Sequence, residues 1–102
     1  MPLPVALYEP DGDALVATGL TRGPWNPDHQ HAGPPAALLA RAIERASGIA
    51  AGQTARLSFD ILGPIPIGRM EIETRVLRAG RRVEQIEATL AADGKTAMRA
   101  TA

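Results

Sequence analysis

The sequence lacks cysteine altogether, and only three of its 102 residues are aromatic. Without cysteine the chain can form neither a disulfide framework nor a zinc–thiolate site, and it has no thiol nucleophile. With so few rings, the core cannot depend on large aromatic side chains. We therefore expect an alanine-rich core in which backbones approach one another closely.

Net charge and long apolar runs are also absent. The 11 basic and 11 acidic side chains cancel, which argues against a surface for nucleic acid. No uninterrupted apolar run approaches the ~20 residues of a membrane-spanning helix, and the first residues lack the basic segment of a secretory signal. These absences predict a cytoplasmic protein with no membrane span and no nucleic-acid partner.

The composition that remains is typical of one globular domain, residues 1–102. Hydrophobic residues make up 45% of the chain, which is too many for a disordered protein. The length suits a single domain. A domain of this size buries only about 60–65% of its unfolded surface, so we expect a modest core that a partner helps to stabilise.

One segment, residues 36–47, has the pattern of an α-helix. Its alanine, leucine, arginine and glutamate residues are strong helix formers, and apolar ones recur at intervals of three and four positions. Pro34 or Pro35 suits the first turn, and Gly48 suits the position after the last. The preceding residues 19–35 predict a long loop rich in glycine, proline and polar side chains, and such a loop in a small domain is often functional.

Alternating apolar and polar residues predict β-strands elsewhere in the chain. A short strand is expected at residues 14–18, and longer ones follow the helix at residues 54–61, 70–77, 84–90 and 95–102. Asp93-Gly94 is a strong signal for a hairpin turn, and the prolines of residues 1–13 predict an extended, peripheral segment. Strands grouped after a lone helix indicate an α+β fold with an antiparallel sheet.

Four stretches within this order carry a more specific pattern. They are Thr21-Arg22-Gly23-Pro24-Trp25 with His31-Ala32-Gly33-Pro34-Pro35-Ala36-Ala37-Leu38-Leu39, Phe59-Asp60-Ile61-Leu62-Gly63-Pro64-Ile65-Pro66-Ile67-Gly68, Leu77-Arg78-Ala79-Gly80-Arg81-Arg82, and Ala91-Ala92-Asp93-Gly94-Lys95. In this order they resemble segments of the acyl-CoA thioesterases related to the type II enzymes. The resemblance implies a hotdog fold, in which a curved antiparallel sheet wraps one central helix.

The resemblance also implies an assembly. In that family two hotdog units usually occupy one long chain, and this sequence is similar to the N-terminal unit. A lone unit leaves its helix and one edge of its sheet uncovered. We therefore expect a homodimer, a higher homo-oligomer or pairing with a second hotdog unit.

The activity that the resemblance implies is hydrolysis of acyl-CoA thioesters in lipid metabolism, with coenzyme A as part of the substrate and no separate cofactor. Hydrolysis requires a polarised carbonyl, a positioned water and a proton acceptor. Free N–H groups at the helix N-terminus can polarise the carbonyl, and Gly33, Ala32 or Ala36 would supply them. Gly33 would let the carbonyl approach closely, although a glycine here also simply permits the turn into the helix.

The water would be activated by a residue of the loop before the helix. His31 is the first candidate, because a neutral histidine near pH 7 is suited to accept a proton, and Asp28 and His29 are the alternatives. His31 has an equally plain structural interpretation, in which it bonds the loop backbone. No spacing typical of a metal site is present.

Four more residues are candidates for substrate binding. Trp25 could line an acyl tunnel, although anchoring of the loop to the sheet is the favoured interpretation. Arg78, Arg81 and Arg82 cluster at a predicted hairpin and suit the phosphates of coenzyme A. An exposed hairpin rich in arginine is, however, more often only a solvated surface.

Two other functions stay open. In the family that the sequence resembles, the catalytic aspartate lies near the start of the strand after the helix, in the C-terminal unit. The corresponding place here is at about Arg56, and Asp60 is a weak substitute. This difference favours a non-catalytic hotdog unit that dimerises, binds acyl groups or supports a catalytic partner. Asn26-Pro27-Asp28-His29 resembles a motif of hotdog enoyl-CoA hydratases, but their aspartate two residues before the asparagine is Pro24 here, so hydration is the least favoured activity.

Overall fold

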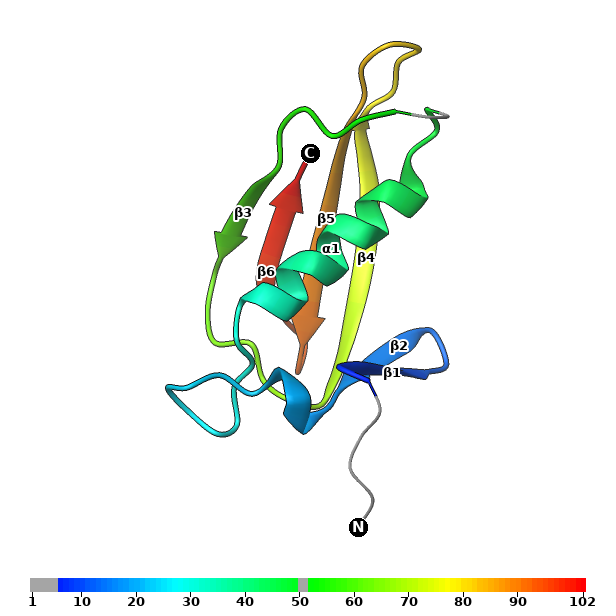
Figure 1. Ribbon diagram of the computed structural model, residues 1–102. Helices are drawn as coiled ribbons and strands as arrows, with labels where there is room; N and C mark the ends of the chain where they lie inside the picture. Colours follow the sequence, from blue (N-terminus) through cyan, green and yellow to red (C-terminus); the bar gives the residue numbers. More distant parts are fainter. Residues whose placement is uncertain (1–5, 50–51) are drawn as a thin grey trace.

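A computed structural model describes residues 6–49 and 52–102, and in this part of the chain an antiparallel six-stranded sheet carries one α-helix (Figure 1). The elements in chain order are β1 (Tyr8–Asp11), β2 (Ala14–Ala17), the 3-10 turn η1 (Gly19–Thr21), α1 (Gly33–Ala46), β3 (Ser58–Ile61), β4 (Arg69–Arg78), β5 (Gln85–Ala92) and β6 (Lys95–Thr101). The strand order is β1-β2-β4-β5-β6-β3. The expected α+β architecture is confirmed.

The strand β1 was not expected as such. Residues 6–13 of the predicted extended segment contain it, paired with β2 in a hairpin, while residues 1–5 lie outside the described part. Gly12 has φ +61 at the turn between these strands, a conformation that glycine adopts without strain. No helix in the described residues is long and apolar enough to cross a membrane.

The helix α1 begins three positions before the predicted start. The helix includes Gly33, and Pro34 and Pro35 lie in its first turn. N–H groups in the first turn have no acceptor within the helix, so the prolines remove no helical hydrogen bond there. The helix ends at Ala46, and Ser47 leaves it in an extended conformation. It packs mainly over β5 and also over β4 and β6.

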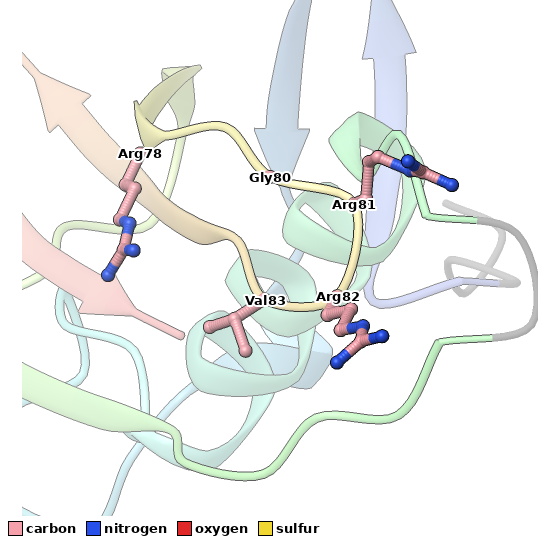
Figure 2. A pocket seen from close by; sticks show the side chains of 5 residues that line it. All are labelled: Arg78, Gly80, Arg81, Arg82 and Val83. Atoms are coloured by element: carbon pink, nitrogen blue, oxygen red, sulfur yellow. The ribbon is translucent and has the colours of Figure 1, made fainter.

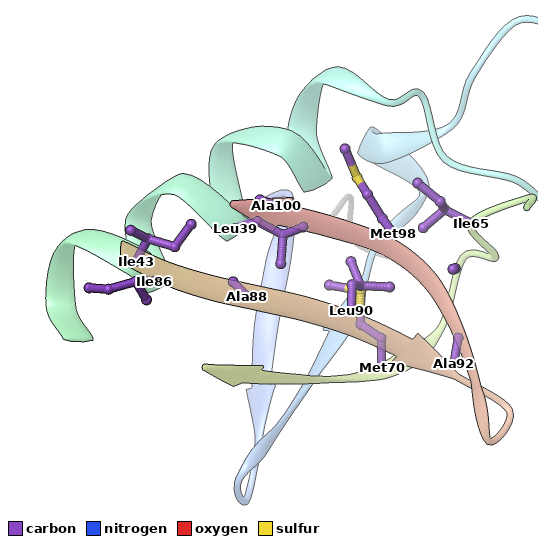
Figure 3. Close-up of a cluster of buried hydrophobic side chains, with 11 residues drawn as sticks. Leu39, Ile43, Ile65, Met70, Ile86, Ala88, Leu90, Ala92, Met98 and Ala100 are labelled. Carbon is purple, nitrogen blue, oxygen red and sulfur yellow. The ribbon is translucent and has the colours of Figure 1, made fainter. Parts of the chain in front are cut away.

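The core lies between the apolar face of α1 and the central strands (Figure 3). Leu39 is fully buried, and Ala88 and Ala100 beneath the helix are also at 0% exposure. These alanines have small side chains, so the helix can approach the sheet closely, as the scarcity of aromatics predicts. Complete burial of a leucine side chain stabilises the fold by about 1.5–3 kcal/mol.

The turn between β5 and β6 is the one that the sequence predicts. Asp93 and Gly94 both have positive φ, +53 and +74, as a two-residue hairpin turn of type I′ requires. The register pairs Leu90 with Met98 and Ala88 with Ala100, so one face of both strands is buried against the helix. The two strands therefore supply the floor of the core.

The strand β3 differs most from prediction. It covers only residues 58–61 of the predicted 54–61, and its side chains are exposed rather than half-buried. Phe59 lies opposite Ala100 and Ile61 opposite Met98, so both belong to the helix-facing side of the sheet. The helix lies over β4, β5 and β6, which leaves Phe59 38% and Ile61 60% exposed.

Candidate functional site

The loop before α1 is held by backbone hydrogen bonds rather than by regular structure. The N–H of His31 donates to the carbonyl of Thr21 at 2.6 Å, and that of Gly23 donates to the carbonyl of His29 at 2.9 Å. Residues 22–30 thus form a small hairpin. A side chain on Gly23 would press against the backbone of His31, so the glycine allows the two arms to meet.

A second set of contacts fastens this loop to the segment before β4. The N–H of Gln30 donates to the carbonyl of Ile65 at 2.7 Å, and that of Ile67 donates to the carbonyl of Asp28 at 2.9 Å. His29 is paired with Pro66 in the same contact. The backbone just before His31 is therefore fixed to its surroundings.

Gln30 fastens the loop through its side chain, a role that sequence reasoning missed. It is only 8% exposed, its Nε2 donates to the carbonyl of Pro66 at 2.8 Å, and its Oε1 accepts from the hydroxyl of Tyr8 at 2.7 Å. Burial raises the pKa of Tyr8 above its ordinary value, so the hydroxyl stays protonated and can donate. Gln30 lies between two histidines in an irregular loop, so no alternation of apolar and polar residues indicates that its side chain is buried.

His31 caps the start of the helix. Its Nδ1 accepts a hydrogen bond from the N–H of Gly33 at 3.2 Å. Because Nδ1 is the acceptor, the proton of the neutral ring is on Nε2. The exposed edge of His31 is consequently a hydrogen-bond donor, and the Gly33 N–H is already engaged.

The remaining candidate donors of the helix start differ in their availability. The N–H of Ala36 donates to the carbonyl of Ala32 at 3.1 Å, as in an ordinary helix. The N–H of Ala32 has no acceptor among residues 6–49 and 52–102. Ala32 has φ −70, so an alanine is accommodated there without strain. Within the described residues, the donors without a partner at the helix start are therefore the backbone N–H of Ala32 and Nε2 of the exposed His31.

Asp28 lies on the small hairpin of residues 22–30, three residues before His31. Its backbone N–H donates to Oδ1 of Asn26 at 2.8 Å, which forms a local turn. Its side chain is exposed and has no hydrogen bond or ion pair within the described residues. The carboxylate of this loop residue is thus exposed and free to accept a proton.

Trp25 stands at the tip of this hairpin and is 94% exposed. The interpretation that it anchors the loop to the sheet is wrong, because the backbone contacts of Gly23, Gln30 and Ile67 do so instead. Trp25 is free to contact a substrate or another chain.

The predicted arginine cluster lies at the other end of the helix. Arg78, Arg81 and Arg82, with Gly80 and Val83, line a cavity of about 510 Å³ at the β4–β5 hairpin (Figure 2). In that view Arg78 extends to one side of the hairpin and the other two arginines extend to the opposite side. Glu84 binds the hydroxyl of Ser47, which places the hairpin beside the C-terminal end of α1.

The predicted site is therefore divided between two places. The 14 residues of α1 span about 21 Å at 1.5 Å per residue. His31, Ala32 and Gly33 are together at one end, Asp28 lies in the loop that leads to them, and the arginine hairpin is at the other end.

Asp60 lies away from the helix start and is paired with an arginine. Its Oδ2 accepts from Nε and an Nη of Arg99 at 3.1 and 3.0 Å, on the face of the sheet opposite the helix. Within the described residues no group of three or more histidines or acids could hold a metal ion.

Comparison with known proteins identifies a family and a fold. The profile of the acyl-CoA thioesterase N-terminal domain matches residues 21–102. No curated protein matches the chain significantly.

Solved structures share the architecture. A conserved protein with a hot dog fold from Alicyclobacillus acidocaldarius has a TM-score of 0.70 at 21% identity, over 92% of this chain and 35% of its own. A phenylacetic acid degradation-related protein of Ralstonia eutropha JMP134, provisionally named a thioesterase, has a TM-score of 0.69 at 24% identity, over 92% and 79%. A Bacillus halodurans protein solved with CoA has a TM-score of 0.68 at 21% identity, over 92% and 67%. At these identities the similarity establishes the hotdog fold, and the chain spans only about a third of the Alicyclobacillus protein.

Proposed function

This chain belongs to the acyl-CoA thioesterase N-terminal domain family, and on that premise we propose that it is one hotdog unit of an enzyme that hydrolyses acyl-CoA thioesters. CoA enters as part of the substrate. A structural neighbour was solved with CoA, which supports this choice of carrier. The reaction adds water to the carbonyl carbon, breaks its bond to sulfur, and gives a carboxylate and a free thiol.

The observation that carries the proposal is the pair of donors at the start of α1 that have no acceptor in the described part of the chain. The N–H of Ala32 and Nε2–H of His31 can both donate to a carbonyl oxygen as it gains negative charge. The positive end of the helix dipole acts in the same direction. The helix start is exposed, so a thioester can reach it.

The proton of the attacking water needs a separate acceptor. Nδ1 of His31 is occupied by the Gly33 N–H, and Nε2 carries the proton, so neither ring nitrogen is free to accept. We therefore assign proton acceptance to the carboxylate of Asp28, and hydrogen bonding to the developing oxyanion to His31. Trp25 and the arginine hairpin are assigned to substrate binding, the arginines to CoA phosphates.

The test is release of free thiol from a series of acyl-CoAs by the purified protein. His31→Ala should lower kcat by about 100-fold or more, as loss of an oxyanion donor does elsewhere. Asp28→Asn should lower kcat to a similar degree, while the matched variant Asp13→Asn, in the exposed β1–β2 turn, should retain full activity. Wild-type rates in both His31→Ala and Asp28→Asn would refute these roles.

A second candidate is a non-catalytic hotdog unit that supports a catalytic partner. By the resemblance, the place of the family's catalytic aspartate falls at about Arg56, and Asp60 is paired with Arg99. Absence of thiol release with every acyl-CoA, together with stable association with a second unit, would favour this function.

Either function includes a second hotdog unit at the β3 edge. Phe59 and Ile61 face the helix side of the sheet but are uncovered, and exposed apolar clusters of this kind mark interaction surfaces. The molar mass from light scattering should exceed that of one chain. Ile61→Lys should reduce it to the monomer mass, whereas the control Val16→Lys on β2 should not.

A further inference from the structure

The outer edge of β3 presents backbone hydrogen-bonding groups. The N–H of Leu62 donates to the carbonyl of Ala97 beside β6 at 2.9 Å. Backbone groups of successive residues point to alternate sides of a strand, so those of Asp60 also point to β6, whereas those of Phe59 and Ile61 point away from it. β3 is the last strand in the sheet order, so in the described part of the chain no strand lies beside these outward groups (Figure 1).

The side chains of this edge differ between the two faces of the sheet. Phe59 and Ile61 lie on the helix side and are exposed. Ser58 and Asp60 lie on the opposite face, where Oδ2 of Asp60 accepts from Arg99 and Oδ1 is left with no donor among the described residues. A strand that joins this edge must therefore bring apolar side chains on one face and a hydrogen-bond donor on the other.

We propose that a second copy of this chain supplies that strand, in an antiparallel pair of β3 strands whose two-fold axis passes through Phe59. The axis is perpendicular to the sheet, so both helices lie on the same side of the joined sheet. A two-fold interface uses the same surface of both copies, which must therefore be complementary to itself. In this register Phe59 lies opposite Phe59 of the other copy, and Ser58 lies opposite Asp60.

The side chains that become neighbours select this register. Opposite residues of two paired strands share a face, so the axis passes through one of the four residues of β3. An axis at Phe59 pairs two aromatic rings on the helix side, and it lets each Ser58 hydroxyl donate to the free Oδ1 of Asp60 in the other copy. An axis at Asp60 would instead bring two carboxylates directly opposite each other, which is destabilising. An axis at Ser58 or Ile61 leaves only one residue pair within the limits of β3.

This inference rests on the proposed function only for the place of the second hotdog unit. It identifies that unit as a second copy of the chain and fixes the residues that meet. It assigns no role to the helix start or to the arginine hairpin. Pairing of the strands and release of thiol are therefore separate measurements, and either can fail without the other.

Cysteine cross-linking tests the register directly, because the chain has no cysteine of its own. A mixture of the Ser58→Cys and Asp60→Cys proteins should form an inter-chain disulfide on mild oxidation, seen as a dimer on a non-reducing gel. Opposite residues of such a pair have Cα atoms about 4.5 Å apart, within the range that a disulfide spans. Each variant alone should stay unlinked, because identical positions in the two copies are then about 8 Å apart. A mixture of Ser58→Cys with the control Glu73→Cys, exposed on β4, should also stay unlinked.

A second measurement leaves the polar face of β3 unchanged. Phe59→Ala should raise the Kd of the dimer about 10- to 100-fold, because both copies lose the facing ring. The control Val76→Ala, at a similarly exposed apolar residue of β4, should leave the Kd unchanged. Circular dichroism of each variant establishes that it is folded.

The outcomes separate this inference from the proposed function. Disulfide formation by Asp60→Cys alone would place the axis at Asp60 and overturn the register. If the chain associates but the mixture stays unlinked, the inference fails and a second hotdog unit in another arrangement stands. A single-chain mass in light scattering would overturn both the inference and the second unit at β3, whereas release of thiol would still support hydrolysis.

Discussion

Replacement of Gln30 by leucine should loosen the loop that carries the candidate catalytic residues. The change removes the donor to the Pro66 carbonyl and the acceptor of the Tyr8 hydroxyl, and it leaves two polar groups without partners. A buried polar group without a partner costs about 1–3 kcal/mol. Tyr8 is only partly buried and can bond to water instead, so we expect a total loss of about 2–3 kcal/mol in the free energy of unfolding.

Urea unfolding at pH 7, followed by far-ultraviolet circular dichroism, measures this loss. Tyr8→Phe alone should cost about 1 kcal/mol, and the double variant should lose about 1 kcal/mol less than the sum of the two single losses, because the two side chains share one hydrogen bond. Glutamine and leucine are similar in size, so packing changes little. If the loss in the double variant equals the sum of the two single losses, or if Gln30→Leu loses less than about 0.5 kcal/mol, the described contacts of Gln30 with Tyr8 and Pro66 do not stabilise the loop.

The same contact predicts a pH dependence with a definite sign. The pKa of Tyr8 is raised in the folded chain above its ordinary value of 10.0. Above that pH the unfolded chain releases the phenol proton while the folded chain keeps it, so stability declines as pH rises. The contribution is fully present below pH 10, and Tyr8→Phe should remove this alkaline decline relative to the wild type.

Three other substitutions test the fold and the site assignments. Gly80→Ala should destabilise the β4–β5 hairpin, because a Cβ there would collide with the carbonyl oxygen of Val83; increased amide exchange in the hairpin is the readout, and unchanged protection would contradict it. Asp60→Asn should cost less than about 1 kcal/mol and leave hydrolysis unchanged, because its partner Arg99 and the pair itself are partly exposed; a large loss of kcat would restore Asp60 as a catalytic candidate. Leu39→Ala should lower the free energy of unfolding by about 2–5 kcal/mol through the cavity that it leaves, and a loss below that range in urea unfolding would show that the helix is not seated on the sheet as described.

The regular elements were the most predictable part of the molecule. The helix, the four strands after it and the turn at Asp93-Gly94 follow from short-range patterns, because apolar periodicity and turn chemistry act over a few residues. The start of the helix was placed too late because prolines normally read as loop residues. The predicted strand 54–61 includes the observed strand at residues 58–61, but the prediction that its apolar face is buried is wrong. Burial of that face depends on where the helix lies across the sheet, which the local pattern does not encode.

The candidate site was predictable in its residues but not in its arrangement. The sequence places His31, Ala32 and Gly33 together because they are neighbours, and the arginine hairpin could be recognised but not located relative to them. The hydrogen bond from Gly33 to His31, which decides the tautomer of the ring, depends on one side-chain rotation. Gln30 and its contact with Tyr8 join residues 22 positions apart, and no local pattern encodes such a pair.

The two edges of the sheet are not equivalent. The outer strand at one edge, β1, is four residues long and contains Pro10, which has no N–H to offer to an added strand. The strand at the other edge, β3, contains no proline. Addition of a strand is thus less favourable at β1 than at β3, so two copies joined at β3 leave only the two β1 edges, at which further strands pair poorly.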